Sequence, residues 1–451
     1  MRSACHLIRR FSVTSPYRVQ QRSLLTLAIE TSCDDTSVAI LEKHNNLASL
    51  HFHSKITSDN RSYGGVHPLV AVESHQRNLA SLIREALQSL PNQPNHSIIQ
   101  KLLVVEARDG TATVRKKPDF VTVTRGPGIR ASLITGLDVA KGLSVAWQIP
   151  LLGVNHMQAH ALTPRLVSAL AANSNGPIDG PRPEFPFLSL LVSGGHTMLV
   201  HSKSLCDHEI IANTTDIAIG DMIDKCARDI LPPVYLDTAK DVMYGKLLES
   251  YIFPNKPSNY DYNPPSSFTR TRTSAVPTYD WVLNPPYPSP GPQGSIKYAD
   301  TFTYSGIGTS VKRVMERKPE MDDGERRVLA KVAMEVAFEH LASRVLFALD
   351  RPDMKNVDTL VVSGGVASNH YLKAILRRNL DIKGYEQVQL VFPPPEYCTD
   401  NAAMIAWTGM EMYDAGWRTK LDVLAERKWA IDPRAKDGGI LGLDGWERVE
   451  T

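Results

Sequence analysis

Apolar runs that end in small polar turns recur along the chain. Leu24–Glu30 and Phe187–Val192 are predicted strands, and Val38–Leu41 and Met198–Val200 are predicted to return after the turns. The turns between them are rich in small residues, whose backbone N–H groups can face a phosphate. Two such hairpins, about one domain apart, favour a duplicated architecture with a cleft between its halves.

A third glycine turn follows the predicted strand Thr359–Val362 and precedes the predicted helix Asn369–Leu380. Strand, Gly364-Gly365 turn and helix together are typical of a unit that contacts a nucleotide, because a helix N-terminus favours negative charge. Further predicted elements are the strands Phe120–Thr124 and Leu151–Val154 and the helices Ala131–Trp147 and Glu325–Leu349. Their alternation predicts an α/β protein.

The proline content changes abruptly within residues 254–294. Ten of the chain's 30 prolines lie in this segment. Because proline interrupts both helices and central strands, we expect an irregular insertion on the surface. Arg270 and Arg272 offer charges to RNA, but a solvated linker is the preferred interpretation.

Residues 1–26 differ in composition from the rest of the chain. They hold five arginines and several serines and threonines, and the first acidic residue is Glu30. This composition predicts a mitochondrial transit peptide, with a disordered basic tail as the alternative. Removing the five arginines from the formal charge of +2 leaves −3, so nucleic-acid binding would require a local basic patch.

The remaining composition excludes several classes of protein. Five cysteines without a CxxC pair predict reduced thiols, and neither a disulfide framework nor a zinc ribbon. The longest apolar stretches, such as Leu188–Val192, are far shorter than the ~18–20 residues of a membrane span, so no membrane partner is expected.

Two histidines stand at the junction of a predicted strand and helix. In Asn155-His156-Met157-Gln158-Ala159-His160 the imidazoles project from one helix face, close enough to share a metal. Two partly buried histidines without a metal are the alternative. Asp400 either caps a following helix or provides the third ligand. Two histidines and one carboxylate suit ferrous iron and also zinc.

The residue after the first histidine excludes one class of enzyme, and a group of charged residues further along the chain allows two interpretations. A zinc peptidase of the HExxH type needs a glutamate after the first histidine, and Met157 cannot replace it. Asp221, Asp224, Lys225 and Arg228 follow one another at helical spacing. They form either a solvated, ion-paired face or a site in which Asp224 accepts a ligand hydroxyl.

The motifs together resemble those of the universal tRNA threonylcarbamoyl transferases, most closely their mitochondrial branch. The resemblance extends over about Leu27–Asp432. It rests on these segments, which stand in the family's order: IETSCDDTSVAI, YGGVHPLVAVESHQRNL, RGPGIRASLITGLDVAKGLS, NHMQAH, LLVSGGHT, DIAIGDMIDKCAR, SGGVASN and CTDNAAMIAW.

The resemblance implies an actin-like fold of the Hsp70 and sugar-kinase type, with two duplicated lobes. The implied layout is residues 27–156 plus 399–432 as the first lobe, 157–398 as the second, and 433–451 as a tail. The implied metal ligands are His156, His160 and Asp400, holding one iron or zinc ion per subunit. The implied substrate contacts are Leu191, Val192, Ser193, Gly194, Gly195, Asp224, Gly245 and Asn369.

The implied reaction transfers threonylcarbamoyl from threonylcarbamoyl-adenylate to the adenosine 3′ to the anticodon, in tRNAs that read codons beginning with A. A separate synthase would supply the donor, AMP would be released, and the protein would act as a homodimer in the mitochondrial matrix. A small-molecule kinase and a non-catalytic nucleotide-binding scaffold are the alternatives. The chain departs from the family at Asp221 (usually Glu), at Gly308 (usually Lys) and before Gly245, where the YPGGP segment is missing.

Overall fold

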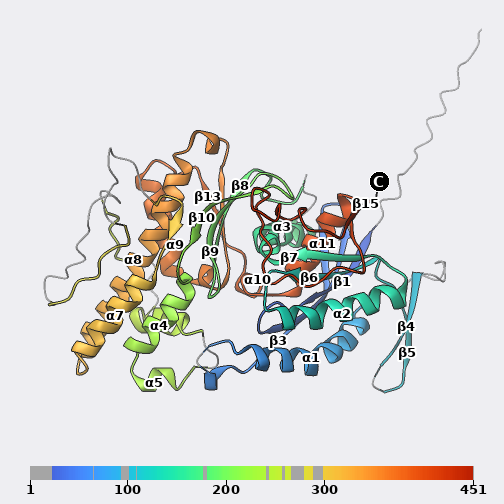
Figure 1. Ribbon diagram of the computed structural model, residues 1–451, viewed down its shortest axis with the longest axis horizontal. Helices are drawn as coiled ribbons and strands as arrows, with labels where there is room; N and C mark the ends of the chain where they lie inside the picture. Colours follow the sequence, from blue (N-terminus) through green and yellow to red (C-terminus); the bar gives the residue numbers. More distant parts are fainter. Residues whose placement is uncertain are drawn as a thin grey trace, which may run out of the picture.

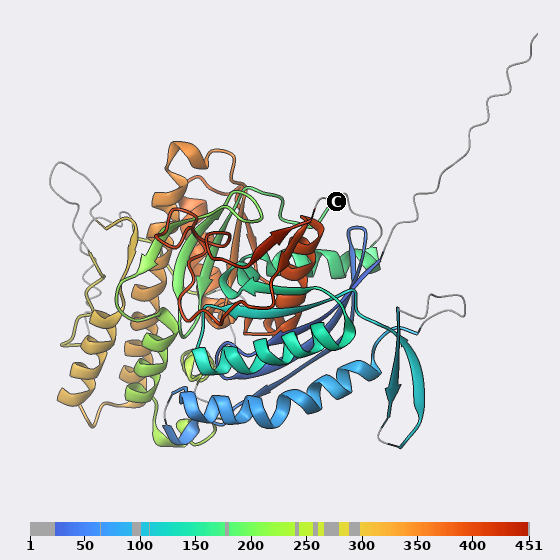
Figure 2. The same cartoon turned by 45° about the vertical axis from the view of Figure 1, so that its right-hand side comes forward.

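The computed structural model describes residues 23–63, 65–92, 101–107, 109–175, 180–239, 243–255, 260–265, 279–287 and 298–449 (Figures 1 and 2). The arginines of the predicted targeting segment, up to Arg22, lie outside these ranges, as do Arg270 and Arg272. Two β-sheets with helices on their faces account for most of the described chain.

The first sheet has seven strands, three of which form an antiparallel meander. In sheet order they are β15 (Trp446–Arg448), β14 (Trp417–Thr419), β7 (Leu151–Asn155), β6 (Phe120–Gly126), β1 (Leu24–Glu30), β2 (Asp35–His44) and β3 (Leu47–Thr57). Strands β3, β2 and β1 are antiparallel to one another, whereas β6 runs parallel to β1 and β7 parallel to β6.

The second sheet repeats this pattern. Its order is β11 (Thr301–Phe302), β10 (His208–Thr214), β9 (Thr197–Ser202), β8 (Phe187–Val192), β12 (Thr359–Ser363) and β13 (Gln389–Val391). Strands β10, β9 and β8 form the antiparallel meander, and β12 and β13 follow in parallel. The hairpins β1–β2 and β8–β9 therefore occupy equivalent places in the two sheets.

The helices form layers around the sheets. The outer face of the first sheet carries α1 (Pro68–Gln88) and α2 (Arg130–Trp147), and α3 (His156–Asn175) and α11 (Ala402–Asp414) pack between the sheets. The second sheet is covered by α4 (Ile219–Ile230), α6 (Gly245–Ile252), α7 (Ser305–Arg317), α8 (Asp323–Leu349) and α9 (His370–Ile382). Short helices are α5 (Pro233–Leu236), α10 (Pro395–Cys398), η1 (Arg61–Tyr63), η4 (Pro352–Met354) and η5 (Gly365–Ser368). A separate ribbon, β4 (Leu102–Glu106) and β5 (Ala112–Lys116), projects beside α1.

Strand β1 shows why its sequence is an almost continuous apolar run. Leu25, Leu27 and Ile29 pack with α1 and α2, while Leu24 and Ala28 face α3 and α11. Both faces of the strand are therefore buried, which is the arrangement that such a run predicts. The predicted hairpin strands and the helices α2, α8 and α9 are confirmed, with ends that differ by a few residues.

The first strand corrects the predicted end of the targeting segment. The sequence assigned residues 1–26 to it, yet Leu24, Leu25 and Thr26 belong to β1 and pair with Lys43, Glu42 and Leu41. Leu25 and Thr26 are also fully buried. A removable segment must therefore end before Leu24, because later cleavage would take away part of a central strand.

The proline-rich segment is irregular where it is described, as expected, but it is not confined to the surface. Its described parts contain no helix or strand. Tyr262, Trp281 and Leu283 are nevertheless buried among the helices of the second lobe. The indole of Trp281 donates to Glu325 (2.9 Å). These apolar side chains fix the segment, a contribution that proline content alone does not indicate.

The C-terminal segment contributes to the first lobe. Strand β15 pairs with β14, and Ile440 is buried in the core between the sheets. Residues 433–449, expected as a tail, thus form part of the folded lobe. No helix in the described ranges combines the length and the apolar character that crossing a bilayer requires.

Candidate metal centre and cleft

The two histidines lie at the start of α3, directly after β7. Asn155 caps this helix, because its side-chain oxygen accepts the N–H groups of Met157 (2.9 Å) and Gln158 (3.1 Å). The cap fixes the first turn of α3, so His156 and His160 lie on one face of it with ring centroids 4.7 Å apart. Both rings are almost completely buried.

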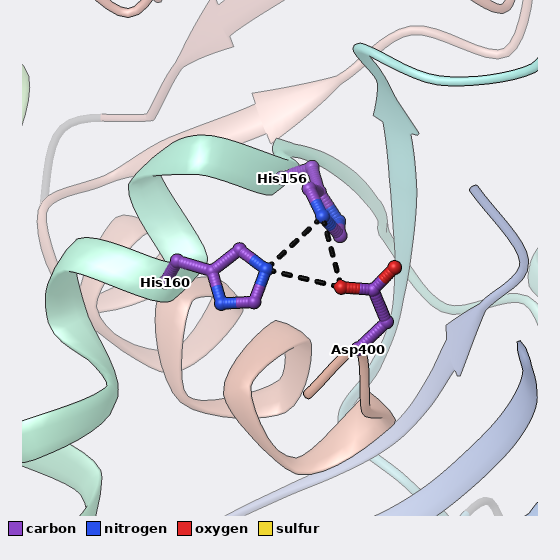
Figure 3. A group of neighbouring side chains, drawn as sticks. All are labelled: His156, His160 and Asp400. Atoms are coloured by element: carbon purple, nitrogen blue, oxygen red, sulfur yellow. Dashed lines mark hydrogen bonds and ion pairs between the residues drawn. The ribbon is translucent and has the colours of Figure 1, made fainter. Parts of the chain in front are cut away.

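Asp400 reaches the histidines from the residue pair that precedes α11. Its Oδ1 lies 3.1 Å from Nε2 of His160 and 3.4 Å from Nε2 of His156 (Figure 3). The sequence left open whether Asp400 caps the helix. The cap is Asn401, whose side chain accepts the N–H of Met404 (3.0 Å), so Asp400 is available to the histidines.

The spacing of these three side chains fits a divalent metal ion. The two Nε2 atoms face each other at 3.2 Å. Nitrogens bound to one tetrahedral zinc at about 2.0–2.1 Å would lie about 3.3–3.4 Å apart. Two imidazoles and a carboxylate also match the donor set of such sites. The three residues can therefore hold a metal ion together.

The electrostatics of the group favour a positive charge at its centre. Burial opposes protonation of His156, but Asp400 and Glu30 outweigh it and raise the pKa of His156 to about 10. Burial likewise opposes ionisation of Asp400, yet His156 and His160 hold the pKa of Asp400 well below its ordinary value. A metal cation would occupy the position where this charge is favoured.

A second group of potential ligands, His201, Glu209 and Asp353, lies on β9, β10 and η4. Its carboxylates are already paired: Glu209 contacts Lys203 (2.7 Å) and Arg434 (3.1 Å), and Asp353 contacts Arg351 (2.8 Å). A cation would have to compete with these ion pairs. The group is therefore better described as an ionic network than as a metal site.

The turn between β8 and β9 lies close to the metal ligands. Exclusion of water by the surrounding protein atoms and, to a smaller extent, the nearby charges of His156 and His160 lower the pKa of His196 to about 4. The sequence predicted that this turn offers several N–H donors. The N–H groups of Gly195 and His196 instead donate to Ser193 Oγ (3.3 and 3.0 Å), and that of Ser193 donates to the His196 carbonyl (2.8 Å).

The predicted substrate contacts at the end of β8 and in the following turn differ in their exposure. Leu191 and Val192 have their side chains in the core, so a ligand can reach only their backbone. Gly194 and Gly195 are exposed, and a Cβ at either would meet no atom within 4 Å. This open stretch of backbone is the part of the turn that a ligand can approach.

Close backbone contacts join the turn to the neighbouring elements. The N–H of Gly220, at the start of α4, donates to the Ser193 carbonyl (3.1 Å). Gly364 has φ +100°, and a Cβ there would lie 2.3 Å from the Val192 carbonyl oxygen. The neighbouring Ser363 donates to the His160 carbonyl (3.2 Å). The metal ligands, the β8–β9 turn and the glycine turn after β12 thus form one continuous region.

Asp224 and Gly245 are brought together at the other end of this region. The N–H of Gly245 donates to Asp224 Oδ1 (2.9 Å). Burial raises the pKa of Asp224 to about 7, although backbone N–H groups of Gly245 and Tyr244 oppose the shift. Asp224 is thus held by the backbone of a neighbouring helix, whereas Asp221 forms an ion pair with Lys225 of its own helix (2.7 Å).

Asn369 has a structural role that the sequence did not indicate. It caps α9, with its Oδ1 accepting the N–H of Leu372 (3.0 Å). Glu249 of α6 accepts the N–H groups of His370 (2.8 Å) and Tyr371 (3.1 Å) at the same helix end. The sequence also overlooked Glu30, which was assigned only as the end of a strand and which contacts His156 (3.2 Å). An acidic residue that ends a buried apolar run was the available signal.

The chain is similar to known proteins over most of its length. The family model described as TsaD, tRNA N6-adenosine threonylcarbamoyltransferase, matches residues 51–407. The mitochondrial tRNA N6-adenosine threonylcarbamoyltransferase of Schizosaccharomyces pombe is 36% identical over 439 residues, 94% of this chain and 89% of that protein. The tRNA N6-adenosine threonylcarbamoyltransferase of Zymomonas mobilis is 28% identical over 422 residues, 93% of this chain and 95% of that protein.

Solved structures match the chain only weakly. YeaZ from Pseudomonas aeruginosa is 15% identical with a TM-score of 0.23, and the match covers 42% of this chain and 64% of that one. HypF from T. kodakarensis is 11% identical with a TM-score of 0.40, covering 86% of this chain and 48% of that one. The family model covers well over half of the chain, and the yeast relative covers nearly all of it. The chain therefore belongs to the tRNA N6-adenosine threonylcarbamoyltransferase family.

Proposed function

We propose that this protein transfers the threonylcarbamoyl group of threonylcarbamoyl-adenylate to the exocyclic amine of the adenosine 3′ to the anticodon in tRNA. The acceptor tRNAs are those that read codons beginning with A. The observation that carries the proposal is the meeting of His156, His160 and Asp400 in a chain of this family. The product is the t6A nucleoside, and the second product is AMP.

The reaction forms one bond and breaks another at the carbamoyl carbon. The amine nitrogen of adenosine attacks that carbon, the bond from the carbon to the phosphate oxygen breaks, and AMP leaves with the electron pair. The amine releases a proton to the solvent. Ser32 is a serine beside a histidine of this region, but that histidine, His156, is already engaged by Glu30 and by the proposed metal. We therefore propose direct transfer without a covalent enzyme intermediate.

The metal site holds one divalent ion per subunit, iron or zinc, through His156, His160 and Asp400. When bound, the ion supplies Lewis-acid chemistry that stabilises negative charge on the donor. The role of the protein is to keep the two Nε2 atoms and one carboxylate oxygen directed at one point. The near-complete burial of the two histidines limits the access of water, which would otherwise compete for the ion and hydrolyse the donor.

The nucleotide part of the donor occupies the region that extends from the β8–β9 turn to α4. Its phosphate approaches the open backbone at Gly194 and Gly195, and Asp224 accepts a hydrogen bond from a ribose hydroxyl. Leu191, Val192 and Asn369 support this region by shaping the turn and capping α9. Gly245 positions Asp224 through its N–H.

The two lobes correspond to the halves of an actin-like nucleotide-binding fold. The repeated order of a three-stranded meander and two parallel strands supports this assignment. The first lobe comprises residues 24–156 and 399–432 together with the C-terminal segment that contains β15, and the second comprises 157–398. We further propose that the protein works as a homodimer and receives its donor from a separate synthase.

The relative from Schizosaccharomyces pombe is named as a mitochondrial enzyme. This protein likewise acts in mitochondria. We propose that the arginine-rich residues before Leu24 direct its import, because they are free of acidic residues and precede a buried strand.

Incubation of the purified protein with threonylcarbamoyl-adenylate and tRNA tests the function. Nucleoside mass spectrometry should detect t6A in the tRNA, together with one AMP released for each modified nucleoside. A matched transcript with guanosine in place of the acceptor adenosine should remain unmodified. A kinase or a scaffold would form no t6A from these reactants, and a kinase alone would convert ATP to ADP in a parallel incubation with ATP.

A further inference from the structure

Glu30 is a fully buried carboxylate at the end of β1. Its Oε1 accepts the N–H of Ser32 (2.5 Å), and its Oε2 accepts the hydroxyl of Thr124. Oε2 also lies 3.2 Å from Nδ1 of His156. Within the described chain, His156 is the only basic side chain that pairs with Glu30. An ionised carboxylate in such a position requires a nearby positive charge or several donors.

The contact with Glu30 determines which nitrogen of His156 carries a proton. An ionised carboxylate only accepts hydrogen bonds, so Nδ1 must be the donor. In the neutral ring Nε2 is then unprotonated, and it points toward His160 Nε2 at 3.2 Å and Asp400 Oδ1 at 3.4 Å. Ser32 Oγ lies at 3.3 Å from the same Nδ1 and can accept or donate, so it cannot fix the tautomer alone.

The two histidines differ in this respect. Nδ1 of His160 is buried and has no hydrogen-bond partner among the described residues. The ring of His156 is therefore held by a carboxylate at its Nδ1, whereas the ring of His160 is held by packing and by Asp400. Carboxylates that bind the remote nitrogen of a metal-ligating histidine orient the ring and make it a better ligand.

We infer that Glu30 is a positioning residue of the metal site, which keeps the proton of His156 on Nδ1 and leaves Nε2 for a divalent cation. This inference rests on the metal site of the proposed function. Charge supports it as well: Glu30, Asp400 and two neutral imidazoles carry a formal charge of −2, which a divalent cation balances.

A purely structural role for Glu30 predicts different behaviour. Ser32 and Thr124 join Glu30 to the β1–β2 turn and to β6. In a glutamine the amide oxygen can still accept the N–H of Ser32, and the amide N–H in the place of Oε2 can donate to the hydroxyl oxygen of Thr124. Glu30→Gln therefore keeps most of the structural contacts. It loses the charge, and its amide can present N–H to Nδ1 and thereby favour the wrong tautomer of His156.

Zinc affinity of the metal-free protein, measured by competition with a chromophoric chelator, tests the inference. We expect Glu30→Gln to bind Zn²⁺ about 10–100-fold more weakly than the wild type. Ser32→Ala, which alters the other neighbour of Nδ1, should remain within about threefold, because Glu30 still fixes the ring. Visible absorption of Co²⁺-loaded protein should differ between wild type and Glu30→Gln, since ring orientation changes the ligand field.

Equal zinc affinity and identical Co²⁺ spectra in wild type and Glu30→Gln would overturn the inference while leaving the metal site intact. Absence of stoichiometric zinc binding in the wild type would overturn the metal site of the proposed function and this inference with it. If Glu30→Gln does not fold, Glu30→Asp keeps the charge but withdraws it by one methylene. It should fold and still lose affinity, and unchanged binding would contradict the role of Glu30.

Discussion

Oδ1 of Asp400 lies 3.1 Å from Nε2 of His160, although 240 positions separate the two residues in the sequence. The contact exists because α3 and α11 pack side by side between the two sheets. Asn155 and Asn401 cap these helices, which leaves His156 and Asp400 available at their starts. The candidate metal site thus depends on two helix caps and on the layer between the sheets.

The nucleotide role of Asp224 predicts a selective loss of binding in Asp224→Asn. The variant keeps the shape of the side chain but loses the charge, so nucleotide affinity should fall by roughly 1.5–3 kcal/mol, the scale of one charge-assisted hydrogen bond. Calorimetric titration of AMP into both proteins measures it. Asp221→Asn, one turn earlier and half-exposed, is the matched control and should bind AMP normally. Equal affinities in all three proteins would remove Asp224 from the site.

The raised pKa of Asp224 predicts a pH-dependent stability. In the unfolded chain the carboxyl ionises near pH 3.8, whereas in the folded protein its pKa is about 7. The protonated form is therefore favoured by folding, and this stabilisation is complete below about pH 4 and is lost as the pH rises through 7. Thermal melts between pH 5.5 and 8.5 should show a smaller decline for Asp224→Asn than for the wild type. Parallel declines would contradict the assignment.

Close approach at the glycine turn predicts a difference between two adjacent glycines. Gly364→Ala places a Cβ 2.3 Å from the Val192 carbonyl at a φ of +100°, so it should destabilise the fold by at least about 1–3 kcal/mol. Gly365→Ala meets no atom within 4 Å and should change stability by less than about 1 kcal/mol. Urea unfolding of both variants measures the difference. A Gly364→Ala protein as stable as Gly365→Ala would show that the turn is not constrained in this way.

The buried part of the proline-rich segment predicts that it stabilises the second lobe. Trp281→Ala removes an indole that is 2% exposed and its bond to Glu325, so unfolding free energy should fall by about 3–5 kcal/mol. The neighbouring Val282 is 42% exposed, and Val282→Ala should change stability by about 0.5 kcal/mol or less. Similar denaturation midpoints for the two variants would mean that the segment is a solvated linker, as the sequence had suggested.

The boundary of β1 predicts the outcome of two truncations. Deletion of residues 2–22 removes the arginines but no described residue, so the protein should keep its melting temperature and transfer activity while failing to enter mitochondria. Deletion of residues 2–26 also removes Leu25 and Thr26, both fully buried, and should yield unstable protein. Cell fractionation and thermal melts separate the two effects. Mitochondrial location of the shorter truncation would contradict the targeting role.

Local pattern predicted much of the framework, and tertiary packing determined the rest. The strands β1 and β8 follow from continuous apolar runs that are buried on both faces, and α2 and α8 follow from apolar residues at three- and four-residue steps. The buried position of Trp281 and the contact of Glu30 with His156 depend on elements that are distant in sequence, and no periodicity records them. Asp224 shows the same limit, since the helical spacing of its charges left open whether it lies on a solvated face, and its bond with the N–H of Gly245 depends on another element.

Metal content of single and double histidine variants tests the central claim most directly. If His156, His160 and Asp400 act as one unit, His156→Ala and His160→Ala should each lose the bound metal and most of the t6A formation. The double variant should then be little worse than either, because the unit fails when one ligand is removed. His201→Ala is the control variant, because His201 belongs to the ionic network with Glu209 and Asp353, and it should keep one metal ion per chain. Full metal content in His156→Ala or His160→Ala, measured by elemental mass spectrometry, would contradict the account.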